Sequence, residues 1–290
     1  MATLLITGAT GMLGGYVLGM AEAQGHKVIA PSRSQFDLKN LESIATFIRE
    51  AKPEAVLHLA AQTDVDLCER DPENAAQSNV LATQEIAKAT AAVGGWLCYI
   101  STSGVFGGAN SIVYNELDLP NPVNYYGRSK LWGEHAVAKY LPFNHLIVRA
   151  AWMIGGGPSK DHKFVGKIVS QIRNGATEIK AVDDKYGTIT VARNLANFLL
   201  ASTNERRCGL FHFASKGAVT RFQIASEIAK TLGYEGALVP VRSNMFPLSA
   251  PRANSEGIES VFLTGENRTA YLGHWQDDLR KYVLEFSDGT

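Results

Sequence analysis

The sequence predicts an α/β fold in which a doubly wound parallel sheet is joined to a small C-terminal lobe. Short apolar runs alternate with longer amphipathic stretches through the first half of the chain, a pattern typical of β-α-β units. The first run, Thr3 to Thr7, continues directly into a glycine-rich turn and a helical pattern, which is the setting of a dinucleotide-binding turn. The 290 residues contain no internal repeat, so their length suits one large domain with a smaller lobe.

The N-terminal half alternates regularly between predicted strands and helices. Strands are assigned where apolar and β-branched residues form short runs, and helices where apolar residues recur every three or four positions. In chain order, these are a strand at 3–7, a helix from about 13 to 25, a strand at 26–30, a helix at 40–50, a strand at 55–59, one long helix at 72–93 and a strand at 96–100. The continuous apolar character of the strand at 55–59 indicates burial on both faces.

The C-terminal half continues the alternation with longer connections. In chain order, it contains a helix that starts near 126, a strand at 146–149, a helix at 164–174, a strand at 178–182, a helix at 191–202, a strand at 210–214, a helix at 221–232 and a final helix at 275–286. Glycines and Pro158 predict a mobile loop after the strand at 146–149. Trp152 in this loop is a candidate for stacking on a substrate ring, and ordinary packing under the loop is the alternative.

The glycine turn after the first strand is the best candidate for cofactor binding. Gly8 permits the tight turn, Gly11 lets the backbone approach a pyrophosphate, and Gly14 lets the helix pack closely on the strand. Thr10, Met12 and Leu13 complete this segment, and the helix N-terminus offers free N–H groups to phosphates. A glycine-rich turn without a ligand is the alternative. The three-and-three glycine spacing of this region resembles the extended short-chain dehydrogenase/reductase family, and a Rossmann-type sheet is expected.

The cofactor preference is read from the end of the second strand. Many NAD-binding proteins place an acid there for the ribose 2′-hydroxyl, whereas an arginine suits a 2′-phosphate. This chain has Ser32 and Arg33 and no acid, which favours NADPH, with NADH as the alternative. Asp37 and Leu38 follow in the position where the resembled family uses an Asp beside the adenine. Asp37 has an equally weighted alternative, which is to help begin the following helix.

Small residues follow the third strand at the edge where ligands bind in open α/β sheets. Ala60, Ala61 and Gln62 leave room there for the backbone of a ligand. We therefore assign these three residues to the cofactor site.

Catalytic chemistry is predicted between residues 101 and 130. Tyr126 and Lys130 lie one helical turn apart and share a face if a helix starts near Tyr126. A free tyrosine has a pKa of about 10, and a neighbouring ammonium is expected to lower that pKa toward the operating pH. Thr102, at the end of the preceding strand, can hydrogen-bond the phenol and polarise a substrate carbonyl. Such a Tyr–Lys pair also occurs on ordinary helices, so the assignment depends on its combination with the glycine turn.

Composition excludes several classes of function. The 28 basic and 28 acidic residues balance, which argues against nucleic-acid binding or an anionic membrane surface. No apolar run is long enough to span a membrane, and the N-terminal strand leaves no room for a signal peptide. Three scattered cysteines suggest a reducing cytoplasm. We predict no metal site, because the adjacent Asp183 and Asp184 are typical of a solvated loop.

Seven segments together resemble the dTDP-4-dehydrorhamnose reductases. They are TGATGMLGG, AAQTDVD, STSGVF, NPVNYYGRSKLWGE, VRAAWMIGG, VDDKYGT and APRANS, in chain order. The resemblance implies reduction of the 4-keto group of a nucleotide-linked deoxysugar by NADPH. It implies a catalytic triad of Thr102, Tyr126 and Lys130, with Trp152 near the sugar and Arg252 and Asn254 close to the sugar nucleotide.

The same resemblance implies a division into two parts. A dinucleotide-binding domain is expected from residues 1–150 plus about 183–215. A substrate-binding lobe is expected from about 151–182 plus 216–290. Whether the chain acts as a monomer or a homodimer is left open.

Two alternatives to this function follow from a departure within the motifs. The family usually has an acid and an aromatic residue where this chain has Ser103 and Gly104. One alternative is a non-catalytic NAD(P)-binding regulatory subunit on the same scaffold. The other is a reductase or epimerase of a different nucleotide sugar.

Overall fold

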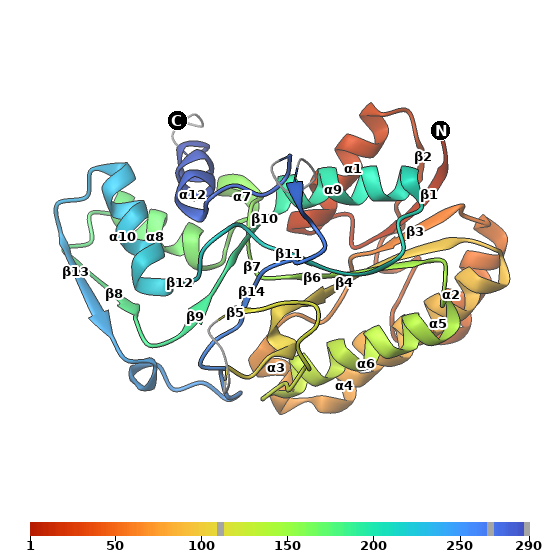
Figure 1. Ribbon diagram of the computed structural model, residues 1–290, viewed down its shortest axis with the longest axis horizontal. Coiled ribbons are helices and arrows are strands. Elements are labelled where there is room, and N and C mark those ends of the chain that lie inside the picture. Colours follow the sequence, from red (N-terminus) through yellow and green to blue (C-terminus); the bar gives the residue numbers. More distant parts are fainter. Residues whose placement is uncertain (109–112, 266–269, 287–290) are drawn as a thin grey trace.

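A parallel sheet forms the centre of the molecule. The computed structural model describes residues 1–108, 113–265 and 270–286, and within these ranges the sheet has six strands in the order β11-β6-β4-β3-β1-β2 (Figure 1). Every neighbouring pair in this order is parallel. The strands are β1 (Thr3–Thr7), β2 (Lys27–Ile29), β3 (Ala55–His58), β4 (Trp96–Thr102), β6 (His145–Ala150) and β11 (Gly209–Phe213). The predicted α/β class with a doubly wound parallel sheet is confirmed.

The direction of winding reverses at β1. This strand pairs with β2 on one side and with β3 on the other, so that Leu5 lies beside both Ile29 and Val56. In such sheets the carboxyl ends of the two strands at the reversal leave a crevice for a ligand. The glycine turn that follows Thr7 therefore opens into this crevice, beside the residues that follow His58.

Helices cover both faces of the sheet. Figure 1 shows α1 (Met12–Ala23) and α9 (Ala192–Glu205) on one face, with α2 (Leu41–Ala51), α5 (Ala82–Ala92) and α6 (Tyr125–Tyr140) on the other. Successive side chains along a strand point to opposite faces of the sheet, so each strand contributes apolar residues to the packing on both faces. Leu4 and Ile6 are completely buried under α1 and α9, while Leu5 is completely buried on the opposite face with Ile44 and Ile86.

The helix predicted at 72–93 is interrupted. The chain forms α4 (Pro72–Ala76), a π-helical turn η1 (Gln77–Leu81) and then α5. A further helix that the sequence did not predict, α3 (Val65–Arg70), precedes them. The side chain of Asp71 accepts a hydrogen bond from the Asn74 N–H and caps α4, which begins with Pro72. This arrangement ends one helix and starts the next within a single residue.

A second lobe has an apolar core of its own. Helices α8 (Phe164–Arg173), α10 (Arg221–Leu232) and α12 (Trp275–Leu284) pack around the parallel pair of strands β8 (Glu178–Val182) and β13 (Ala237–Val241). The buried residues of this core include Ile168, Ile179, Ile224, Leu279 and Val283.

Several short elements connect the two parts. The segment predicted as a mobile loop contains a strand, β7 (Trp152–Ile154), which pairs with β10 (Ile189–Val191). The other short elements are β5 (Val113–Tyr114), β9 (Tyr186–Gly187), β12 (Val219–Thr220), β14 (Gly257–Ile258), α7 (Gly157–Lys160) and the 3₁₀ turns η2 (Ser103–Val105) and η3 (Ser243–Met245). The sequence predicted none of them, because strands of two or three residues have no readable periodicity and depend on their pairing partners.

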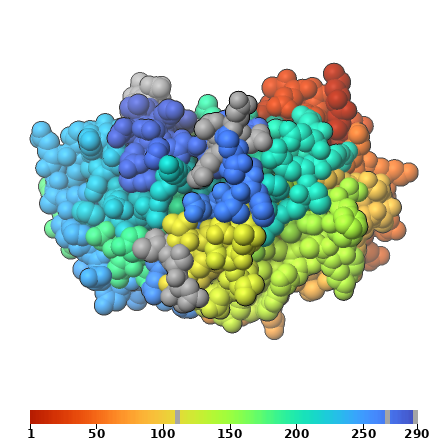
Figure 2. All heavy atoms as spheres, in the orientation of Figure 1, coloured from red at the N-terminus to blue at the C-terminus, as the bar shows by residue number. Residues whose placement is uncertain are grey.

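These cores support the proposed division into a dinucleotide-binding domain and a substrate-binding lobe. Figure 2 shows the C-terminal segments, in blue, gathered toward one end of the molecule and the N-terminal segments, in red and orange, at the other. The segment around β14 departs from the proposed limits. Ile258 packs with Val105 and Phe106, and Leu263 packs against the core of the sheet. Within the described ranges, no helix is both long and apolar enough to cross a membrane.

Candidate active site

A cavity of about 1030 Å³ lies between the carboxyl edge of the sheet and the second lobe. It contains almost the whole predicted site. The predicted residues that line it are Gly8, Thr10, Gly11, Met12, Leu13, Gly14, Ser32, Arg33, Asp37, Leu38, Ala60, Ala61, Gln62, Thr102, Tyr126, Lys130, Trp152 and Arg252. Asn254 does not line it.

The glycine turn has the form that a dinucleotide phosphate requires. Gly8 has a φ of +70°, and a Cβ there would lie 2.9 Å from the Ala60 nitrogen. A Cβ on Gly14 would lie 2.1 Å from the Gly8 oxygen, so the helix approaches the turn as closely as its backbone allows. Gly11 is the N-cap of α1, no side chain caps this end, and the first turn carries no acid. Its N–H groups are therefore available to an anion, and the residues fit a dinucleotide.

The end of β2 carries no carboxylate toward the cavity. Arg33 is exposed on the cavity wall, and Ser32 donates hydrogen bonds from its N–H and its hydroxyl to the Gln35 side chain. Asp37 accepts a hydrogen bond from the Lys39 N–H at 3.0 Å. Helix α2 is capped by Asn40, whose side chain accepts from the Ser43 N–H. Asp37 therefore orders a turn at the cavity and does not start the helix.

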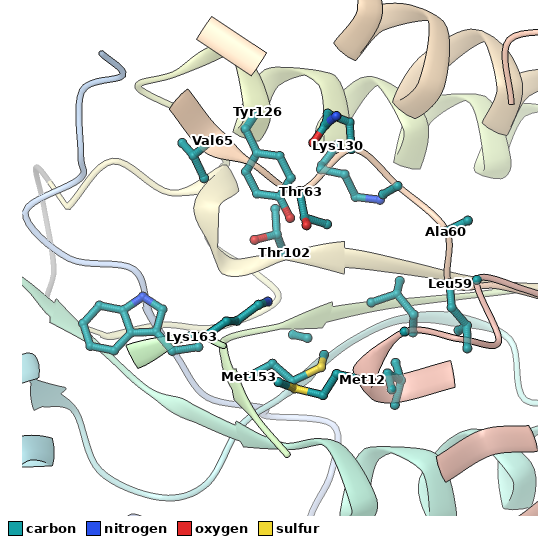
Figure 3. A pocket seen from close by; sticks show the side chains of 18 of the residues that line it. Met12, Leu59, Ala60, Thr63, Val65, Thr102, Tyr126, Lys130, Met153 and Lys163 are labelled. Atoms are coloured by element: carbon teal, nitrogen blue, oxygen red, sulfur yellow. The ribbon is translucent and has the colours of Figure 1, made fainter. Parts of the chain in front are cut away.

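Tyr126 and Thr102 converge from two distant parts of the chain. Figure 3 shows the Tyr126 hydroxyl directed toward Thr102 and Thr63, and Tyr126 forms a hydrogen bond with the Thr102 side chain. The side chain of Asn124 caps α6 by accepting from the Gly127 N–H at 2.9 Å. A Cβ on Gly127 would lie 2.1 Å from the Gly104 oxygen. The first turn of α6 is thus seated directly on the turn that follows Thr102.

Burial dominates the titration of Tyr126 and Lys130. Burial raises the pKa of Tyr126 to about 12, although the hydrogen bond with Thr102 acts in the opposite direction. Burial lowers the pKa of Lys130 to about 7, although the negative charge of Glu134 acts in the opposite direction. The expectation that Lys130 lowers the pKa of Tyr126 is therefore wrong for the protein without ligands. The Lys130 ammonium instead lies 4.0 Å from the centroid of the Tyr99 ring, and the dry surroundings penalise a phenolate.

A buried ion pair lies one helical turn beyond Lys130. Arg149 donates two hydrogen bonds to the Glu134 carboxylate, at 2.9 and 2.7 Å, and the Ser101 hydroxyl donates a third. The sequence placed Glu134 on the same helix as Lys130, but only the fold brings Arg149 from β6 to it.

The π-helical turn η1 connects two segments of the site through hydrogen bonds. Asn79 in this turn accepts a hydrogen bond from the Gln62 N–H at 2.8 Å and donates to the Ser129 hydroxyl at 3.0 Å. It therefore links the residues after β3 to α6. A π-helical turn inside a long helix often marks a functional position, but the sequence of this segment gives no sign of it.

Trp152 lies on the cavity wall with charged neighbours. Its Nε1 donates to the Glu256 carboxylate at 3.4 Å, and the Arg221 guanidinium carbon lies 3.8 Å from the ring centroid. A Cβ on Gly187 would approach three indole carbons within 2.7 Å. One face of the indole is therefore occupied by Arg221. Sequence reasoning missed Arg221 and Glu256, because neither belongs to a recognisable motif.

Arg252 is held by an acid from the first half of the chain. Its Nη2 lies 2.7 Å from Asp66 Oδ2, and Asp66 Oδ1 also accepts from the Ala250 N–H. Burial alone raises the pKa of Asp66, but these hydrogen bonds and the Arg252 charge leave it below its ordinary value. The amide oxygen of Asn254 accepts from the Lys185 ammonium at 2.8 Å. Lys185 does line the cavity, so Asn254 orients a cavity residue without lining the cavity itself.

Two tyrosines hold the loop after β7. The Tyr16 hydroxyl on α1 accepts from the Gly156 N–H at 3.1 Å. The Tyr282 hydroxyl on α12 hydrogen-bonds to the Gly155 oxygen and to Asp161 Oδ2, both at 2.8 Å. The loop is thus fastened to α1 on one side and to α12 on the other.

The acids Asp183 and Asp184 also have structural partners. Asp183 accepts from the Thr220 hydroxyl at 2.7 Å, and Asp184 accepts from both the N–H and the hydroxyl of Ser243. These bonds join the loop after β8 to the start of α10 and to η3.

The chain is similar to known proteins along nearly its whole length. The family model described as RmlD substrate binding domain matches residues 1–287. A dTDP-4-dehydrorhamnose reductase from Mycobacterium tuberculosis is 35% identical over 99% of this chain and 94% of its own length. The crystal structure of a dTDP-4-dehydrorhamnose reductase from Yersinia enterocolitica is 51% identical, with a TM-score of 0.96 over 99% of this chain and 100% of that one. Another, from Bacillus anthracis in complex with NADP, is 26% identical, with a TM-score of 0.89 over 98% of this chain and 99% of that one.

Proposed function

The chain belongs to the RmlD substrate binding domain family, and from this membership we propose that it reduces the 4-keto group of a dTDP-linked deoxysugar with NADPH. The relatives named dTDP-4-dehydrorhamnose reductase match nearly the whole chain, which supports the reaction. The observation that carries the proposal is the meeting of Tyr126 and Thr102 in the cavity that also contains the uncapped start of α1.

The residues around the glycine turn fit NADPH. The N–H groups at the start of α1 would hold its diphosphate. Ser32 and Arg33 would hold the adenosine ribose and its 2′-phosphate, because an arginine and no acid directly follows β2, and Asp37 on the same wall accepts the Lys39 N–H. When bound, NADPH supplies the hydride that the reduction needs. The complex of the Bacillus anthracis reductase with NADP supports this choice of cofactor.

In this proposal, three side chains polarise the carbonyl, donate the proton and hold the nicotinamide ribose. Thr102 polarises the substrate carbonyl through a hydrogen bond. Tyr126 donates the proton to the carbonyl oxygen, and its raised pKa keeps the phenol protonated at neutral pH until that oxygen becomes basic. Lys130 holds the nicotinamide ribose and returns positive charge to the site as Tyr126 gives up its proton.

A panel of nucleotide-linked 4-keto sugars tests the reaction. The protein is mixed with NADPH, and with NADH in parallel, while the nicotinamide absorbance is followed. We expect oxidation with a dTDP-linked 4-keto-6-deoxysugar. Tight binding of NADPH without turnover on any member of the panel would favour the regulatory subunit instead. Turnover confined to a uridine or guanosine diphosphate sugar would favour a reductase of another nucleotide sugar.

Location and assembly stay predictions. All three cysteines of the chain are unpaired, with Cys68 and Cys98 buried and Cys208 exposed, which supports a reducing compartment such as the cytoplasm. A homodimer is the assembly to test, and light scattering on the purified protein measures it directly.

A further inference from the structure

We propose that Arg221 and Lys163 form the receptor for the diphosphate of the nucleotide sugar, on the cavity wall opposite Thr102 and Tyr126. This inference depends on the proposed function, because it assigns one part of the proposed substrate to named residues.

Neither cation has a directly bonded partner of opposite charge, and only charges at longer range act on them, Glu256 on Arg221 and Asp161 on Lys163. Neither side chain forms an ion pair or a hydrogen bond with any residue that the structure describes, although both line the cavity. The nearby acids are already engaged. Asp161 hydrogen-bonds to Tyr282 and to the Lys163 N–H, and Glu256 accepts from Trp152. The other large cation of this region, Arg252, is neutralised by Asp66.

Burial makes this lack of partners costly. It lowers the pKa of Arg221 to about 10 and the pKa of Lys163 below its ordinary value, and the opposing charges of Glu256 and Asp161 do not compensate for it. The Arg221 charge lowers the pKa of Lys163 further. Two like charges that share a dry space destabilise one another. An anion bound between them would remove this cost, whereas a neutral group would not.

Aromatic rings hold the guanidinium in a fixed orientation. Its central carbon lies 3.8 Å from the centroid of the Trp152 ring and 4.9 Å from that of Phe164. Stacking uses the faces of the guanidinium and leaves its N–H groups free at the edges. A planar fork of donors fixed in this way suits the paired oxygens of a phosphate.

The position of the cations matches the shape of the substrate. Figure 3 shows Lys163 entering the cavity from the side opposite Tyr126 and Thr102. In a pyranose, C1 lies across the ring from C4. A sugar whose C4 carbonyl faces Thr102 and Tyr126 therefore carries its C1 diphosphate toward Lys163 and Arg221. The diphosphate of NADPH is served elsewhere, by the start of α1 at Gly11.

Binding measurements on three variants test the assignment. Calorimetry compares the affinity for dTDP with that for thymidine, which lacks phosphate, in the presence of NADP⁺. Arg221→Met and Lys163→Met each remove one cation at nearly constant length. Arg280→Met is the matched control, because Arg280 also contacts α10, through Glu227, but lies outside the cavity.

We expect Arg221→Met to weaken dTDP binding by about tenfold to a hundredfold, the usual effect of losing charged hydrogen bonds. Lys163→Met should weaken it less, and Arg280→Met should not change it. Thymidine affinity and NADPH affinity should stay within about twofold of the wild type for all three. Arg221→Lys should keep part of the dTDP affinity, because the charge remains and the planar fork is lost.

Other outcomes would overturn the assignment. Equal losses for dTDP and thymidine would mean that Arg221 only positions Trp152. A loss confined to NADPH would place the two cations at the cofactor. The failure of the proposed function looks different, because dTDP would then still bind through Arg221 while no 4-keto sugar was reduced. A wild-type protein that does not bind dTDP would refute both proposals.

Discussion

Tyr126 has two properties of a proton donor, namely a hydroxyl aimed at Thr102 and a pKa that burial raises to about 12. We expect Tyr126→Phe to lower kcat by about a hundredfold to ten-thousandfold, the range for the loss of a general acid. The affinity for NADPH should stay nearly unchanged, because the ring remains. Stopped-flow measurement of NADPH oxidation and fluorescence titration of NADPH give the two quantities. A variant with near-normal turnover would remove Tyr126 from its assigned role.

Lys130 shows a conflict between function and stability. Its folded-state pKa is about 7, below the ordinary value of 10.5, so between these pH values the unfolded chain binds more protons than the folded one. Stability then rises with pH through this window, and the cost of burying the charge is greatest below pH 7. We therefore expect Lys130→Met to melt at a higher temperature than the wild type at pH 6.5, with a difference that shrinks by pH 10. Turnover and NADPH affinity should both fall.

The comparison of Lys130→Met with the wild type isolates Lys130 together with the two groups whose pKa its charge lowers, His58 and Cys68. Differential scanning calorimetry across the pH series provides the melting temperatures. A difference that is constant over the whole series would mean that the lysine does not titrate with the lowered pKa.

At the scale of elements, α6 depends on two glycine backbones in contact. A Cβ on Gly127 would lie 2.1 Å from the Gly104 oxygen, whereas a Cβ on Gly19 of α1 would meet nothing within 4 Å. Gly127→Ala should therefore destabilise the protein by about 1–3 kcal/mol and lower kcat, because α6 must move away from Thr102. Gly19→Ala is the control and should stabilise by up to about 1 kcal/mol. Urea denaturation measures the free energy of unfolding of both variants, and turnover assays measure kcat. Equal effects of the two substitutions would contradict the prediction for Gly127.

The long elements were predictable from sequence and the short ones were not. The strands at 3–7, 55–59 and 96–100 and the helices at 40–50 and 221–232 have a periodicity that the core enforces, and all are found. Strands β7, β9 and β10 exist only because distant segments pair with them. The π-helical turn at Gln77–Leu81 is invisible in sequence, since its residues suit an α-helix equally well.

The same contrast applies to the site. Gly8, Tyr126 and Lys130 were predictable because their chemistry depends on spacing along one stretch of chain. Arg221 and Glu256 meet at Trp152 only through the packing of α10 and the segment after β13. No local pattern encodes that meeting, so the sequence alone does not reveal it.

At the scale of the whole molecule, Asp66 joins the first half of the chain to the late loop that carries Arg252. The pair is half-buried, with side-chain exposures of 23% and 27%, so its net contribution to stability is small. We expect Asp66→Asn to change the melting temperature little. It should raise KM for the nucleotide sugar by about tenfold, because the loop loses its anchor to the residues after β3.

Asp277→Asn is the control for this change, since Asp277 also pairs with an arginine but is 62% exposed on α12. Its KM values should match those of the wild type, and NADPH KM should be unaffected in both variants. Steady-state kinetics at saturating NADPH measures the effect. An Asp66→Asn protein with an unchanged KM would mean that the loop keeps its position without this link.

The Tyr282 hydroxyl, which fastens Gly155 and Asp161 to α12, also has a consequence for biosynthesis. All six strands of the central sheet precede residue 214, so a growing polypeptide can form this sheet and its glycine turn before Tyr282 leaves the ribosome. We therefore expect ribosome-stalled chains that end before α12 to bind to a resin that carries NADP. The same chains should reduce no ketone.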